Sequence, residues 1–394
     1  MRILYITLEN LSLHKGSVVH VKEVVAGLRK RGHQVGLIAR ASSKSVDTYP
    51  FYNIHYSAFF PLKFLGPTRK LYFISAVWLF IYLFKVLSRY DVIYVREFYA
   101  SVIALLPRLL YHKKIIYEIN GLANEEQKLK SRSIFNRTIV FLIKRAEKMA
   151  ARNSDQIVSV TPYIARYLIK EFRCRPDRVK VISNGVNTKK FYPVHDKNLL
   201  SQWRERLNIG DGEILIVFIG NLAPWQGIEY LIQVAPFLLK EKKNVRFLIV
   251  GEGIWKDKYQ MSVSELGLSD YFIFTGMVDH EQIPIYINIA DICVLPKRKL
   301  KSGYSPIKLY EYMACGKPII SSQAEGLEFI EEEGIGRVID PENTVSFKEA
   351  LKDLIQDQKK REAMGERALF VARKRFDWEI KVIEIEKILK ELLA

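Results

Sequence analysis

The segment 302–318, SGYSPIKLYEYMACGKP, constrains the fold more than any other part of the chain because it marks both ends of a short helix. Ser305 is a residue type that favours N-caps, and Pro306 suits the first helical position. Gly316, followed by Pro318, is typical of a helix end. The sequence therefore predicts a short helix within this segment, with its start fixed at Ser305.

The flanking apolar stretches 289–295 and 318–321 predict two parallel strands that this helix connects. Such a helix points its N-terminus at the carboxyl edge of the sheet, where open α/β sheets bind ligands. There the backbone N–H groups of Ile307 and Lys308, the helix dipole and the Lys308 ammonium would converge on an anion. Glu311, on the same helix, can accept hydrogen bonds from a ribose. Together these groups predict a nucleotide-sugar site.

Strand and helix patterns alternate from the first residue to about residue 340, which is typical of parallel α/β architecture. The first series of predicted strands lies at 2–7, 34–39, 92–95, 114–118, 156–160 and 179–183. The second series lies at 213–220, 245–251, 271–275, 291–295 and 318–321. Two consecutive doubly wound parallel sheets follow from this layout.

The turn-rich segment 184–196 is the natural linker between the two series. We expect a first domain over residues 1–194 and a second over 195–375. The remaining segment, 376–394, is predicted as a helix that returns to the first domain.

The net charge is concentrated in the N-terminal half. Residues 1–195 contain 33 Lys and Arg against 12 Asp and Glu, a net charge of +21, whereas residues 196–394 contain 28 against 31, a net charge of −3. A half this basic favours an anionic partner, which can be a nucleic acid, an acidic membrane surface or a phosphorylated substrate.

Cysteine usage and the N-terminus favour a cytoplasmic protein. The three cysteines are odd in number and far apart, as in a reduced compartment, and the first residues predict a strand rather than a signal peptide. The apolar segment 71–87 would span about 25 Å as a helix, short of a hydrocarbon core of roughly 30 Å. It is interpreted as a buried crossover helix. The alternative is a shallow contact with the inner face of the membrane, which the aromatic and basic residues at 59–70 favour.

Several motifs spread along the chain form a recognisable set. They are Ser305-Pro306-x-Lys308-x-x-Glu311 with its continuation to Pro318, the Asn184-Gly185-Val186 turn, Gly16 with His20, Gly251-Glu252-Gly253, and Phe376-x-Trp378. With these motifs the chain resembles, over nearly its full length, the retaining GT-B glycosyltransferases of family 4, also called group 1. The resemblance implies an α/β fold of two doubly wound, Rossmann-like parallel sheets that face a central cleft.

The resemblance also implies transfer of a sugar from a nucleoside diphosphate with retention at the anomeric carbon and without a bound metal or other cofactor. The sequence contains no Asp-x-Asp pair to hold a divalent ion. Lys308 and the helix N-terminus would then stabilise the departing diphosphate, because preorganised positive groups meet the charge that develops there.

Candidate site residues follow from the edge glycines and from the resemblance. The candidate donor-binding residues are Gly16, Gly220, Asn221, Gln226, Gly251, Val278, Ser305, Pro306, Ile307, Lys308 and Glu311. The candidate catalytic residues are Asn120, Lys308 and Glu311, and the candidate acceptor-binding residues are His20, Glu118 and Asn120. No metal ligand is proposed, since the histidines lack metal-ligand spacing.

The chain departs from the family pattern at four positions. Gly303 stands where the family often has the first of two paired glutamates, Asn120 stands where it has a histidine, and Asn221 and Gln226 stand where an Arg and a Lys grip the phosphates. A neutral amide can hydrogen-bond to sugar or phosphate but does not shuttle protons at neutral pH.

The preferred interpretation is an enzyme that extends a glycan or lipid-linked acceptor in surface-polysaccharide biosynthesis, with the basic half near an anionic membrane surface. Three alternatives stay open. The departures above are compatible with a noncatalytic partner protein of the same fold. The positive charge is compatible with a nucleic-acid-binding protein, although no nucleic-acid-binding motif is present. A sugar-nucleotide epimerase or a phosphorylase on the same scaffold is the third.

Overall fold

The computed structural model describes residues 1–11, 16–40, 69–128, 134–298 and 304–394. The chain divides into two compact units. Unit 1 comprises Met1–Asn184, Ser302–Tyr304 and Trp378–Ala394, and unit 2 comprises Gly185–Lys301 and Ser305–Asp377. The sequence-based boundary at residue 194 lies inside unit 2.

Unit 1 contains a six-stranded parallel sheet with the order β2-β1-β3-β4-β5-β6. Its strands are β1 (Arg2–Asn10), β2 (Gln34–Arg40), β3 (Val92–Val95), β4 (Lys114–Ile119), β5 (Gln156–Ser159) and β6 (Val179–Val181). The order changes direction between β1 and β3, which is the topological switch point of a doubly wound sheet. All six strands had been predicted from the sequence.

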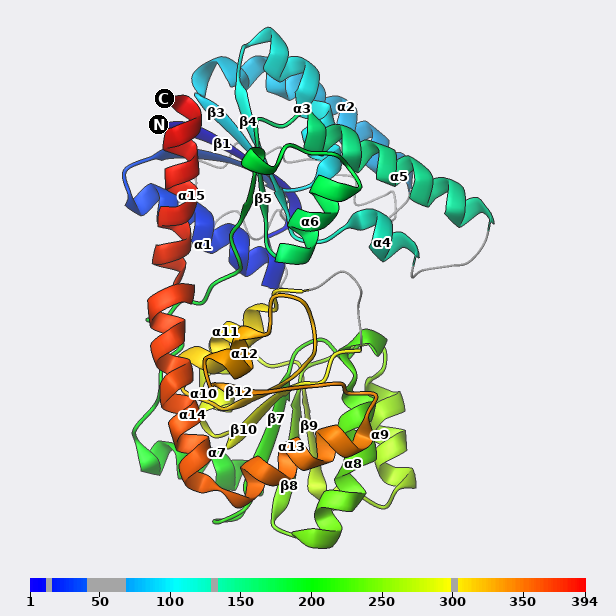
Figure 1. Ribbon diagram of the computed structural model, residues 1–394, viewed down its shortest axis with the longest axis vertical. Helices are drawn as coiled ribbons and strands as arrows, with labels where there is room; N and C mark the ends of the chain where they lie inside the picture. The colour runs from blue at the N-terminus through cyan, green and yellow to red at the C-terminus, as the bar shows by residue number, and fades with distance from the viewer. Residues whose placement is uncertain (12–15, 41–68, 129–133, 299–303) are drawn as a thin grey trace. The chain divides into compact units, whose positions relative to one another are not determined.

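Helices cover both faces of this sheet (Figure 1). Alternate strand residues such as Ile3 and Tyr5 pack against α1 (Gly16–Lys30) and α15 (Trp378–Leu393). The intervening residues, such as Leu4 and Ile6, pack against α2 (Arg69–Val86) and α3 (Phe98–Leu110). Farther along the same face, α5 (Ile134–Arg152) and α6 (Pro162–Lys170) cover β4 and β5. The short helix α4 (Ala123–Lys128) precedes α5.

Unit 2 repeats this architecture with the strand order β12-β11-β10-β7-β8-β9, again parallel throughout. Its strands are β7 (Ile214–Ile219), β8 (Val245–Val250), β9 (Phe272–Gly276), β10 (Ile292–Leu295), β11 (Ile319–Ser322) and β12 (Gly336–Ile339). Strand β12 had not been predicted, because a four-residue stretch that begins with glycine gives little periodicity. It pairs with β11 and extends the sheet by one edge strand.

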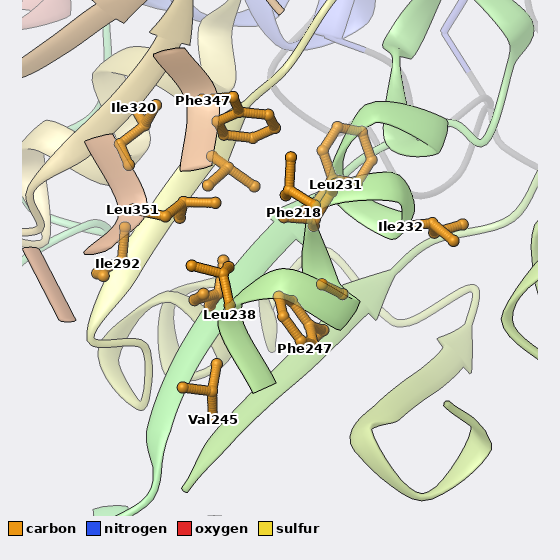
Figure 2. Close-up of a cluster of buried hydrophobic side chains, with 14 of the residues drawn as sticks. Phe218, Leu231, Ile232, Leu238, Val245, Phe247, Ile292, Ile320, Phe347 and Leu351 are labelled. Carbon is orange, nitrogen blue, oxygen red and sulfur yellow. The ribbon is translucent and has the colours of Figure 1, made fainter. Parts of the chain in front are cut away.

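One face of this sheet carries the core shown in Figure 2, which includes Phe218, Phe247, Leu231 and Phe347. The helices of this face are α8 (Ile228–Glu241), α9 (Lys256–Glu265) and α13 (Thr344–Gln356). The other helices of unit 2 are α7 (Lys197–Arg206), α10 (Ile283–Asn288), α11 (Ile307–Ala314), α12 (Phe329–Glu332) and α14 (Gln358–Val371).

The segment 71–87 forms most of α2 and packs on the sheet through buried Leu79, Leu83 and Val86. Val77 and Ile81 on the same helix are exposed. Within the described residues, no helix is both long and apolar enough to cross a membrane. The aromatic residues at 59–64, which favoured a membrane contact, lie outside the described part of the chain.

Candidate active site

The predicted helix exists as α11, but it begins two residues after Ser305. Ile307 is its first residue and Pro306, with extended backbone angles, occupies the N-cap position. The expected cap by Ser305 is therefore wrong. Its hydroxyl instead lies 2.8 Å from the Tyr310 hydroxyl, and this contact places the segment before the helix. Gly316 adopts φ +69° after the helix, as the sequence predicted.

Lys308 extends from the first turn of α11 to the end of β7. Its ammonium Nζ lies 3.3 Å from Oε1 of Gln226 and 4.2 Å from the centre of the Phe218 ring. A Cβ atom on Gly220 would lie 2.4 Å from Nζ, and Gly220 has φ +143°. Glycine is required at this position because the lysine passes directly over the backbone.

A second glycine keeps the ends of β7 and β8 close together. A Cβ atom on Gly251, whose φ is +138°, would lie 2.0 Å from the carbonyl oxygen of Gly220. Gly253 likewise approaches Oδ1 of Asn221, which a Cβ atom would meet at 2.6 Å. The carboxyl edge of the sheet, where open α/β sheets bind ligands, is thus formed by closely packed backbone beside Lys308.

Glu311 lies one turn after Lys308 and is buried. Its Oε1 lies 3.9 Å from Nε2 of His280. The Nδ1 atom of His280 lies 2.8 Å from Nζ of Lys190, which also pairs with Glu281 at 2.7 Å. The carboxylate therefore faces a histidine that a lysine holds in place.

Burial brings the pKa values of Lys308 and Glu311 close together. It lowers the pKa of Lys308 to about 7, with Lys297 acting in the same direction and Glu311 in the opposite one. Burial raises the pKa of Glu311 to about 7, while Lys308 and Lys190 act to lower it. Two neighbouring groups with pKa values close to neutral mark a functional-site candidate, because binding and catalytic sites often contain groups with shifted pKa values.

In unit 1, a fully buried carboxylate, that of Glu118, organises the predicted acceptor-side residues. Its two oxygens accept a hydrogen bond from the Tyr94 hydroxyl at 2.7 Å and one from the Asn120 amide at 2.6 Å. His20 Nε2 lies 2.8 Å and Arg96 Nε 3.3 Å from Oε1. Burial alone would raise the pKa of Glu118. The interactions with His20, Arg96 and Tyr94 lower it by more than burial raises it, and the resulting pKa is about 2.

His20 also contacts the residue that ends the first segment of unit 1, Asn184, and the residue that begins its last segment, Trp378. Its Nδ1 lies 2.7 Å from Oδ1 of Asn184, and its ring contacts Trp378 edge-on at 5.0 Å between ring centres. Both ring nitrogens thus lie close to side-chain oxygens. Glu118 and His20 are both buried, and Glu118 holds the side-chain amide of Asn120 in place.

The structure places the other predicted residues at the ends of elements. Gly16 is the first residue of α1, and Val278 lies in the loop after β9. Asn221 and Gln226 follow β7, and Gln226 is in contact with Lys308. Arg298, the last described residue before Tyr304, pairs with Glu229 at 2.5 Å. Gly303 lies outside the described residues.

Among the described residues, no group of three or more His, Cys, Asp or Glu side chains is placed to hold a metal ion. Sequence reasoning missed Lys190 and His280 as neighbours of Glu311. These two residues are 90 positions apart, so no spacing pattern links them. Only the fold shows that the linker after Asn184 and the loop after β9 meet at α11.

Comparison with known proteins covers both halves of the chain. Residues 14–190 match the family model Glycosyltransferase Family 4, and residues 201–369 match the model Glycosyl transferases group 1. An uncharacterized glycosyltransferase of Methanocaldococcus jannaschii is 26% identical over 96% of both chains. A GDP-mannose-dependent alpha-(1-6)-phosphatidylinositol monomannoside mannosyltransferase of Mycolicibacterium smegmatis is 25% identical over 61% of this chain and 65% of that protein.

Among solved structures, HepE of Anabaena in complex with UDP superposes with a TM-score of 0.79, at 19% identity, over 99% of this chain and 100% of that one. This similarity concerns the fold. With the two family models, it shows that the chain belongs to family 4, or group 1, of the glycosyltransferases and has the GT-B fold.

Proposed function

We propose that this glycosyltransferase takes its sugar from a nucleoside diphosphate sugar, which unit 2 binds at the N-terminus of α11. The observation that carries the proposal is the pair Lys308 and Glu311, one turn apart on α11, beside the glycine-lined end of β7. Lys308 and the free N–H groups of the first turn would meet the diphosphate, and Glu311 would accept hydrogen bonds from the ribose.

We further propose that transfer proceeds with retention of the anomeric configuration and without a divalent metal. The first turn of α11 and Lys308 would supply the positive charge that a metal supplies elsewhere, since preorganised donors stabilise charge on a leaving group. Asn120 of unit 1 is the proposed contact to a sugar hydroxyl. Its N–H is engaged by Glu118, so its carbonyl oxygen stays available to accept a hydrogen bond from a sugar hydroxyl.

The proposed acceptor is a glycan or lipid-linked glycan, in surface-polysaccharide biosynthesis near an anionic membrane. The net charge of +21 over residues 1–195 supports an anionic acceptor or surface. A relative that acts on phosphatidylinositol monomannoside also supports a membrane lipid as acceptor.

Transfer and hydrolysis assays over a panel of nucleotide sugars, with and without EDTA, test this function. We expect turnover of at least one donor, no loss of rate in EDTA, and a product whose anomeric configuration matches that of the donor by NMR. Inversion of configuration or full inactivation by EDTA would contradict the proposal. Failure of UDP, GDP and ADP to bind at all would favour the noncatalytic alternative.

A further inference from the structure

Three adjacent helices of unit 1 present apolar side chains to solvent. Helices α2, α3 and α5 lie next to one another over one face of the sheet (Figure 1). Each of six large apolar side chains on them is more than half exposed: Ile81, Leu106, Leu109, Leu110, Phe141 and Leu142. Large apolar groups gathered in this way usually mark an interaction site, because single exposed ones are common but clusters are not.

Exposed arginines accompany these apolar groups. On α5, Arg137, Arg145 and Arg152 are exposed, and the Arg145 guanidinium lies 4.7 Å from the centre of the Phe141 ring. Positions 137, 141 and 145 follow one another at a spacing of four residues, which puts them on the same side of the helix. No carboxylate lies within ion-pair distance of these three arginines in the part of the chain that the structure describes.

Acidic residues are almost absent from the three helices. Helices α2 and α3 contain none, and α5 contains only Glu147. Glu147 is buried and accepts hydrogen bonds from the amides of Ala123 and Asn124, so it does not reach the surface.

The six apolar side chains and the three arginines are here called the apolar–basic face, and none of the three helices adds an exposed acidic residue to it. Two acids from other elements, Asp155 and Glu171, pair with Arg108 on α3 and with Lys144 on α5.

This combination selects one kind of partner. Leu, Ile and Phe side chains can enter the boundary between lipid headgroups and acyl chains while Arg side chains bind the anionic headgroups. A second copy of the same face would bring like charges together, which opposes a symmetric dimer. A nucleic acid would use the arginines but leave the six apolar groups in water.

We propose that the apolar–basic face docks unit 1 on an anionic lipid bilayer. This proposal rests on the proposed function, because the expected acceptor is linked to a membrane. It adds the surface by which unit 1 would reach that membrane. Its test does not require turnover, so that failure of docking and failure of sugar transfer can be told apart.

Flotation of the full-length protein with vesicles measures docking directly. The vesicles consist of phosphatidylcholine with or without about 30% phosphatidylglycerol, and the salt is about 0.05 M or about 0.5 M. We expect flotation with the anionic vesicles at low salt and a loss of at least about tenfold in bound protein at high salt or with neutral vesicles.

Two triple variants separate the contributions of charge and apolar surface. Arg137→Glu with Arg145→Glu and Arg152→Glu reverses the charge, and Leu109→Ser with Leu110→Ser and Phe141→Ser removes the apolar groups. Each should lower vesicle binding about tenfold or more. The matched controls lie in unit 2: Lys240→Glu with Lys242→Glu and Lys243→Glu makes the same change in net charge, and Met261→Ser removes an apolar side chain of α9 that is 62% exposed.

All four variants should bind UDP or GDP like the wild type, because none of their substitutions falls on α11 or on the candidate donor-binding residues. Equal loss of vesicle binding in the unit 2 charge control would overturn the proposal, since net charge and not this face would then be responsible. A dimer that the apolar triple variant abolishes would overturn it in favour of self-association. Tight RNA binding that the arginine variant abolishes, without vesicle binding, would overturn it in favour of a nucleic acid.

Discussion

Two buried carboxyl groups dominate the chemistry at the scale of single residues, and their environments differ. Glu118 has a pKa of about 2 because three donors and cations surround it, whereas Glu311 has a pKa of about 7 because burial outweighs Lys308 and Lys190. The first carboxylate is charged at all physiological pH values and holds its neighbours in place. The second changes its charge in the neutral range, as expected of a group that a ligand completes.

Replacing Glu118 with Gln should destabilise unit 1. Its pKa is depressed from 4.5 to about 2, so the carboxylate stabilises the folded state above pH 4.5, and this contribution is lost as the pH falls toward 2. Removing it leaves the buried Arg96 guanidinium without its counter-charge, at a cost of about 3 kcal/mol. We expect the midpoint of thermal unfolding at pH 7 to fall on the order of 10 °C.

The exposed acid Glu391 is the matched control on α15. Glu391→Gln should leave the unfolding midpoint unchanged. If the two variants unfolded at the same temperature at pH 7, the Glu118 network would contribute nothing to stability.

Nucleotide binding should depend on pH with a maximum near pH 7. Binding of a diphosphate needs protonated Lys308, which is lost above about pH 7, and the ribose contact needs ionised Glu311, which is lost below about pH 7. Titrations of UDP between pH 5.5 and 8.5, roughly one and a half units on either side, measure this profile. The terminal phosphate of UDP titrates as well, so each variant is compared with the wild type.

One variant tests the fall in affinity above pH 7, and another tests the fall below pH 7. Lys308→Ala should remove the fall in affinity above pH 7 and keep the fall below it, while Glu311→Gln should do the reverse. Identical profiles for the wild type and both variants would show that neither group titrates with binding.

At the scale of elements, the carboxyl edge of the second sheet is built from glycines that allow close contacts. Gly251 packs on the backbone of Gly220, and Gly220 packs on the Lys308 side chain. Sequence reasoning located this edge and α11, because caps and glycines leave a local signature. It placed the start of α11 wrongly, because Ser305 bonds to Tyr310 instead of capping the helix. A hydroxyl has several possible partners, and the fold decides between them.

Substitution of Gly220 by Ala tests the contact between β7 and α11. The added Cβ would lie 2.4 Å from Nζ of Lys308, so the ammonium must move. We expect affinity for UDP or GDP to fall about tenfold, because a charge-assisted contact is worth roughly 1.5–3 kcal/mol. Calorimetric titration measures the change.

Gly267 is a suitable control because it also has a positive φ, +65°, but nothing lies within 4 Å of an added Cβ. Gly267→Ala should keep the affinity of the wild type. An equal loss in both variants would attribute the effect to backbone strain rather than to Lys308.

At the scale of the whole molecule, the two sheets and their helices were predictable because parallel strands leave long apolar runs between helical patterns. Eleven of the twelve strands, all but β12, gave such a signal. Contacts between residues far apart in the sequence were not predictable. Lys190 and His280 reach Glu311, and Asn184 and Trp378 reach His20, only through the tertiary fold.

The assignment of roles to the two units rests on α11. Unit 1 carries the positive net charge and the Glu118 network, whereas unit 2 carries Lys308 and Glu311. If unit 2 binds the nucleotide, loss of either α11 residue must weaken binding without unfolding the protein.

Isothermal titration of UDP, GDP and ADP into the wild type, Lys308→Ala and Glu311→Ala measures this most directly, with Lys348→Ala and Glu349→Ala on α13 as matched controls. We predict that the wild type and both controls bind at least one of the nucleotides alike. Each α11 variant should bind it about 10- to 100-fold more weakly while keeping the unfolding temperature of the wild type. Unchanged affinity in both α11 variants would contradict a nucleotide site at this helix.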